Sequence, residues 1–111
     1  MSVRQMIGEV QAEVLAGDLT PIRAAELDMR LTALLGNCFE EIRESEAAYN
    51  QVYLGCLNSC EAANRAKIHA AITPEFKRWR EAKDTHEFAL QMIRSTRSYT
   101  RASAEEARLQ R

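Results

Sequence analysis

The sequence predicts an all-α protein, with an N-terminal amphipathic helix followed by a long antiparallel helical hairpin of the coiled-coil type, assembled into an oligomeric bundle. Apolar side chains recur at steps of three and four residues along most of the chain. The chain has only 4 glycines and 2 prolines, and few such residues favour long helices. A length of 111 residues fits one domain. We therefore expect a single helical domain over residues 1–111, with helices at about 3–16, 21–35, 38–72 and 74–108.

The first predicted helix carries one apolar stripe. Ser2 is a suitable N-cap, and Gly17 is a suitable residue to end the helix. The stripe needs a surface against which to bury, and either a second copy of the chain or the base of the hairpin supplies one. We expect a homo-oligomer, in the form of a dimer. The stripe residues of this helix are Val3, Ile7, Val10 and Val14.

The second predicted helix begins with Thr20 as N-cap and Pro21 in the first turn, where the missing N–H costs nothing. Its inward positions are predicted to include Ile22, Leu31 and Leu35. Residues 36–40 resemble a capping box after a glycine. A kink, a short interruption and an uninterrupted helix all remain open at this point.

A heptad-like seam continues along the next two predicted helices, with Thr73 and Pro74 opening the last one. The helices are equally long and the connection between them is short, which favours antiparallel packing. That register places Val52 near Ile93 and Cys60 near His86. The larger seam residues are Leu35, Ile42, Tyr49, Val52, Trp79 and Ile93.

Three side chains could in principle carry chemistry in this register. Cys56 and Cys60 share a helix face, and His86 is predicted to lie opposite them. These are zinc ligand types, and a cysteine beside a histidine can act as a nucleophile. A helical seam offers no cleft or oxyanion hole, and small cysteines are common in cores. We interpret these three residues as packing, with no catalytic residues, no metal and no cofactor, so the chain is not expected to be an enzyme.

Charge is distributed unevenly, although the formal net charge is only −1. The last helix carries a stripe formed by Arg94, Arg97, Arg101 and Arg108, with Tyr99 among them and Arg111 extending it. Guanidinium, hydroxyl and aromatic groups together suit phosphate backbones. Our first interpretation is that the stripe pairs with the chain's own acidic cluster, within one chain or across a dimer, and binding to a protein or to nucleic acid are the alternatives. The acidic cluster comprises Glu40, Glu41, Glu44 and Glu46.

The sequence also bears on location. No apolar run is long enough to span a membrane, and charges within the first helix argue against a secretory signal. An odd count of 3 cysteines indicates free thiols in a reducing compartment. We therefore expect a cytoplasmic protein with no membrane partner.

The segments "AANRAK" (62–67), "PEFKRWREAK" (74–83) and "MIRSTRSYTRASAEEAR" (92–108) carry a resemblance. In these the chain resembles the small helical-hairpin proteins of tailed phages, most of them uncharacterised. The resemblance implies a phage origin and a binding role, on a host protein or in DNA metabolism, and it implies no catalytic residues.

The sequence thus predicts a non-enzymatic protein–protein interaction module. The function that we expect is a phage-encoded inhibitor or adaptor that acts on a host protein, such as a defence or DNA-metabolism factor, in the host-cell cytoplasm. The alternative is a nucleic-acid-binding accessory protein of replication or recombination that uses the arginine stripe.

Overall fold

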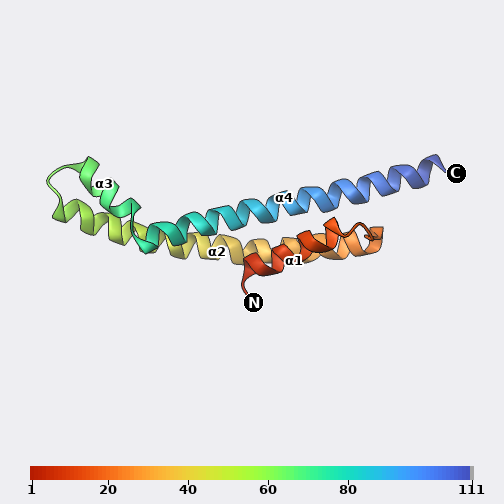
Figure 1. The fold of residues 1–111 in the computed structure, drawn as a ribbon, viewed down its shortest axis with the longest axis horizontal. Coiled ribbons are helices and arrows are strands. Elements are labelled where there is room, and N and C mark those ends of the chain that lie inside the picture. Colours follow the sequence, from red (N-terminus) through yellow and green to blue (C-terminus); the bar gives the residue numbers. More distant parts are fainter. Residues whose placement is uncertain (111) are drawn as a thin grey trace. The chain divides into compact units, whose positions relative to one another are not determined.

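The computed structural model describes residues 1–110, and within them the chain forms helices and no strands (Figure 1). The all-α prediction is confirmed. The helices are α1 (Val3–Leu15), α2 (Pro21–Ser59), α3 (Ala63–Ala71) and α4 (Pro74–Leu109).

Local capping chemistry sets most of the helix ends. The Ser2 hydroxyl accepts a hydrogen bond from the Gln5 N–H, and the Gln5 side chain accepts one from the Ser2 N–H, which completes a capping box. Gly17 follows α1 with a φ of +83°, the left-handed conformation that glycine adopts without strain. Thr20 and Thr73 cap α2 and α4 through their hydroxyls. All four signals are visible in the sequence.

Helix α2 runs without interruption past residues 36–37, which settles the alternatives that the sequence leaves open. The separate helix predicted to end near residue 35 is therefore wrong. A glycine inside a helix costs only about 1 kcal/mol relative to alanine, and an exposed asparagine is tolerated, so neither residue ends a helix by itself.

The predicted helix over 38–72 is also wrong, because the chain leaves the helical conformation at residues 60–62. Ala62 is extended, with φ −119° and ψ 136°, and no side chain caps the start of α3. Asn58 and Ser59, at the end of α2, are weak helix formers. On α3, Ala66 and Ala70 are buried. The residues between α2 and α4 therefore form a short helix of their own, and the predicted register is lost.

Contacts divide the chain into two compact units. The terminal unit comprises residues 1–37 together with those from Thr85 onward, and the central unit comprises residues 38–84. The prediction that residues 1–111 form one domain stays a prediction.

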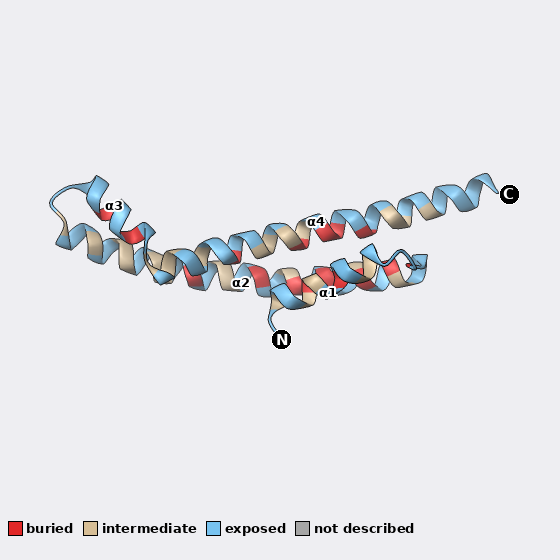
Figure 2. Cartoon of the chain, in the orientation of Figure 1, coloured by how far each residue is buried: buried red, intermediate tan, exposed pale blue. Residues whose placement is uncertain are grey.

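The terminal unit has an aliphatic core (Figure 2). Ile7 and Val10 of α1 are buried there, so the stripe of the first helix packs inside its own unit. Its flanking members Val3 and Val14 are half-buried. Leu31 and Ile93 are buried, and Leu35 is half-buried. The further buried apolar residues of this unit are Leu19, Ala24, Leu27, Leu34, Ala89 and Met92.

Ile22 departs from its predicted inward position, since 76% of it is exposed. The buried positions of α2 follow Ala24, Leu27 and Leu31. At 100° per residue, Ile22 falls on the opposite side of the helix from these residues.

The central unit has a different interior. Every buried residue among 38–84 is small, namely Cys38, Ser45, Ala66, Ala70 and Ala82. The larger predicted seam residues of this unit are only half-buried, namely Ile42, Tyr49, Val52 and Trp79.

Candidate interaction surfaces

The arginine stripe of α4 is partly engaged inside the terminal unit. The Arg97 guanidinium lies 3.3 Å from an Asp28 carboxylate oxygen on α2. The Tyr99 hydroxyl donates a hydrogen bond to the Leu19 carbonyl. Arg94 lies 3.9 Å from Glu87 on its own helix, with both side chains largely exposed. Two of the predicted binding residues, Arg97 and Tyr99, therefore stabilise the fold of this unit.

Arg101 and Arg108 are exposed in the last turns of α4. Arg111 lies outside the residues that the structure describes. Tyr99 is hydrogen-bonded to Leu19, which lies just before the first residue of α2. The turns of α4 after Tyr99 therefore extend beyond the N-terminal end of α2. Exposed guanidinium groups here can meet an external anion.

The acidic cluster of α2 pairs with Arg78, and not with the arginine stripe that the sequence suggested. Arg78 donates hydrogen bonds of 2.7 and 3.2 Å to the two carboxylate oxygens of Glu41, and it lies 3.7 Å from Glu44. This bidentate arrangement raises the pKa of the Arg78 guanidinium, chiefly through the hydrogen bond to Glu41. Pairing within the chain is thus observed, but through Arg78.

An aromatic cluster lies beside this ion pair in the central unit. Tyr49 of α2 stacks on Trp79 of α4 with a centroid distance of 5.0 Å and an interplanar angle of 15°. Tyr49 also contacts Phe76 at 5.3 Å and Tyr53 at 6.0 Å. All four aromatic rings belong to half-buried residues. Aromatic pairs contribute stability beyond their buried area, and here they bring α2 and α4 together.

Two cations lie against the same rings. The Lys83 ammonium is 4.2 Å from the centroid of the Trp79 ring, and the Arg80 guanidinium is 6.0 Å from that of Phe76. The face of an aromatic ring attracts cations. The Trp79 indole N–H is buried without a hydrogen-bond partner, so the indole contributes through its ring.

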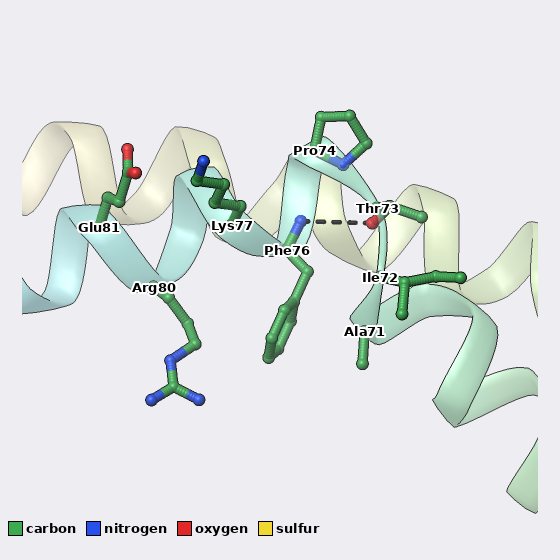
Figure 3. Close-up of a pocket in the computed structure, with 8 residues that line it drawn as sticks. All are labelled: Ala71, Ile72, Thr73, Pro74, Phe76, Lys77, Arg80 and Glu81. Carbon is green, nitrogen blue, oxygen red and sulfur yellow. Dashed lines mark hydrogen bonds between the residues drawn. The ribbon is translucent and has the colours of Figure 1, made fainter.

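An open groove of about 690 Å³ lies where α3 leads into α4. In Figure 3, Phe76 and Arg80 extend to one side of α4, whereas Lys77 and Glu81 extend to the other. The Phe76 N–H donates a 3.3 Å hydrogen bond to the Thr73 hydroxyl, which fixes the start of the helix. The residues lining the groove are Ala71, Ile72, Thr73, Pro74, Phe76, Lys77, Arg80 and Glu81.

Sequence reasoning singled out Trp79 but missed this groove. The groove depends on α3, a helix that the sequence did not predict. The signal that was available is the segment "ITPEFKRWR", in which an isoleucine precedes the cap and aromatic residues alternate with basic ones.

The predicted cysteine and histidine group is divided between the two units. Cys56 and Cys60 belong to the central unit, whereas His86 belongs to the terminal unit. Within residues 1–110, no three or more Cys, His, Asp or Glu side chains are grouped to hold a metal ion. All three cysteines are free thiols, and burial raises the pKa of the Cys38 thiol.

Comparison with protein-family models, curated proteins and solved structures found no match to this chain. Across the described residues, each helix lacks either the length or the apolar content needed to cross a membrane.

Proposed function

We propose that this chain is a non-enzymatic protein–protein interaction module, and that its partner site is the groove between α3 and α4 together with the aromatic cluster. The observation that carries the proposal is the high exposure of the Ile72 side chain. This side chain lines the groove, as does the half-buried Phe76, and it is 78% exposed. A large aliphatic side chain in such a position gains free energy when a partner covers it.

The chemistry of the surroundings supports the proposal. Trp, Tyr and Arg are the residue types enriched at the centres of protein interfaces, and Tyr49, Trp79 and Arg80 lie together here. Arg80 and Lys77 line the groove, with Glu81 as its one acidic lining residue. A protein segment with an apolar anchor flanked by acidic side chains fits this surface.

We also propose that α2 and α4 form an antiparallel, coiled-coil-like pair. In the terminal unit, contacts run from Leu19–Tyr99 to Asp28–Arg97. In the central unit, they run from Glu41–Arg78 to Tyr49–Phe76. In both units the residue numbers rise along α2 as they fall along α4, which supports an antiparallel direction.

The resemblance to small hairpin proteins of tailed phages makes a host protein in the cytoplasm the proposed partner, with inhibition or adaptation as the outcome. The free thiols are consistent with a reducing compartment.

A nucleic-acid-binding accessory role is the second candidate, favoured by the exposed guanidinium groups of Arg101 and Arg108. It ranks lower because Arg97 and Tyr99 are engaged by Asp28 and Leu19. Binding to phosphates weakens steeply as salt rises, whereas an apolar protein interface is far less sensitive.

The test uses the full chain carrying a photo-crosslinking residue in place of Ala71, an exposed residue that lines the groove, incubated with host-cell proteins both with and without nuclease treatment. We expect one crosslinked partner, lost on Ile72→Arg and retained on Ile68→Arg. Ile68 is the matched control, because it is 64% exposed on α3 but does not line the groove. Equal loss in both variants contradicts the groove as the site. Complexes rich in nucleic acid that disappear in high salt support the second candidate.

A further inference from the structure

One face of α2 in the terminal unit is apolar and has no covering element. It carries two large exposed side chains, Ile22 at 76% and Met29 at 74% exposure. On this face, the exposed residues between and beyond them are small, namely Ala25, Ala33 and Gly36. This outer stripe, at steps of three and four residues, comprises Ile22, Ala25, Met29, Ala33 and Gly36.

The neighbouring helices occupy the other sides of α2. Arg23 binds Glu13 of α1 at 2.6 Å on one flank, and Asp28 binds Arg97 of α4 on the other. Leu27 and Leu31 are buried in the core. At 100° per residue, the outer stripe points directly away from Leu31. A straight partner helix can therefore approach α2 along this face.

We infer that the outer stripe is the interface of a homodimer, in which α2 packs against α2 of a second copy in antiparallel orientation about a two-fold axis at Met29. Such an interface must be self-complementary. With Met29 facing Met29, Ile22 faces Gly36 and Ala25 faces Ala33. The large side chain at each end meets a glycine, and the small pair between lets the helices approach closely.

Charge complementarity supports a second copy as the occupant. Glu26 and Arg30 lie on the same flank of the stripe, one turn apart, and both are exposed. One carboxylate oxygen of Glu26 also accepts a 3.0 Å hydrogen bond from Arg23 of its own chain. In an antiparallel pair centred on Met29, Glu26 of each chain lies next to Arg30 of the other. The two-fold axis forms this pair twice.

The size of the contact predicts its strength. The overlap from Ile22 to Gly36 spans about 21 Å of helix. One helix pair of this length buries less than the roughly 800 Å² per partner of a standard stable interface. The dimer is therefore expected to dissociate at micromolar concentrations. This interface lies in the terminal unit and does not depend on the groove of the central unit.

The experiment is sedimentation equilibrium of the full chain from about 1 to 500 μM, a range chosen to bracket micromolar dissociation. It compares the wild type with Met29→Glu and Gly36→Leu. A Cβ at Gly36 meets no atom within 4 Å, so leucine is accommodated within one chain and improves helix propensity. In the dimer the same leucine collides with Ile22 of the partner. We expect a dimer in the wild type, and dissociation constants raised at least about tenfold in both variants.

Gly55→Leu is the matched control. Gly55 is also an exposed α2 glycine with no atom within 4 Å of a built Cβ, and it lies outside the stripe. The Gly55→Leu variant should gain thermal stability, as Gly36→Leu does, and it should dimerise with the dissociation constant of the wild type. A wild type that stays monomeric over the whole range overturns the inference. So does a dimer that Met29→Glu and Gly36→Leu leave unchanged.

Discussion

The terminal and central units are built from the same two long helices, yet different interactions hold them together. In the terminal unit, Ile7 of α1 and Leu27 and Leu31 of α2 are fully or almost fully buried. In the central unit, the buried residues are small, and the half-buried rings of Tyr49, Phe76 and Trp79 make the larger contacts. Burial of aliphatic side chains stabilises a fold without leaving them free to bind. The comparison teaches that a partner of the central unit meets half-buried rings, whereas a partner of the terminal unit meets the exposed side chains outside its aliphatic core, such as Ile22 and Met29.

Leu31→Ala gives the largest expected effect, because it opens a cavity in the core of the terminal unit. We expect the free energy of unfolding to fall by about 2–5 kcal/mol. Leu54→Ala, at an exposed position on the same helix in the central unit, should change it by no more than about 0.5 kcal/mol. Urea unfolding followed by far-ultraviolet circular dichroism measures both. Similar losses in the two variants would contradict the distinction between the units.

Trp79→Ala tests the aromatic cluster of the central unit. Removing the ring abolishes the stack on Tyr49 and the contact with Lys83. Because Trp79 is only half-buried, the expected loss is about 2 kcal/mol, less than for a fully buried ring. Trp79→Phe keeps an aromatic face and should recover most of this loss. A Phe variant as unstable as the Ala variant would argue against ring stacking as the cause.

Thr20→Ala and Thr73→Ala compare the helix caps of the two units. Each removes a hydroxyl that accepts a backbone N–H at the start of a long helix. Each substitution should lower the free energy of unfolding by about 1 kcal/mol, measured by the same urea titration. Thr→Ser at either site retains the acceptor and serves as the control. If the serine variant loses as much free energy of unfolding as the alanine variant, the threonine methyl group and not the hydroxyl cap is the source of the stability.

The Glu13–Arg23 ion pair gives the smallest expected effect, and it depends on pH. The hydrogen bond from Arg23 lowers the pKa of Glu13 from its ordinary 4.5. A carboxylate with a depressed pKa stabilises the fold above its unfolded-state pKa, and it loses that contribution as the pH falls through the folded-state value. Glu13→Gln should therefore flatten the decline in stability below about pH 4.5. Thermal unfolding at a series of acidic pH values measures the slope, and an unchanged slope would count against the ion pair.

The helix starts could be predicted because each depends on a few neighbouring residues. Ser2, Thr20 and Thr73 cap the helices where the sequence indicates, and Gly17 ends α1 with a positive φ. Gly36 shows the limit of such signals, since a glycine pattern without proline left several outcomes open. A glycine inside a helix costs only about 1 kcal/mol relative to alanine, so it does not by itself decide where the helix ends.

The register of α2 against α4 and the groove could not be predicted, because the sequence gives no clear signal for the break after α2 or for the packing of α3. No glycine or proline marks the break at residues 60–62, and the alanines of α3 have too little apolar surface to set a register. Once the chain departs from the helix there, every facing pair along α4 changes. Within the central unit, Arg78 binds Glu41, and the groove forms with Phe76 in its lining.

Ser45 and Thr96 are buried hydroxyl residues on the two long helices, one in each unit. Each hydroxyl donates to a carbonyl three residues earlier in its own helix, namely those of Ile42 and Ile93. These hydroxyls therefore fill space without linking their helix to a neighbour. Small side chains and internally bonded hydroxyls make a smooth contact, along which one helix can slide by fractions of a turn at little energetic cost. In mechanical terms, we expect the central unit, in which every buried residue is small, to respond to a load by shear along the helix axis before it separates.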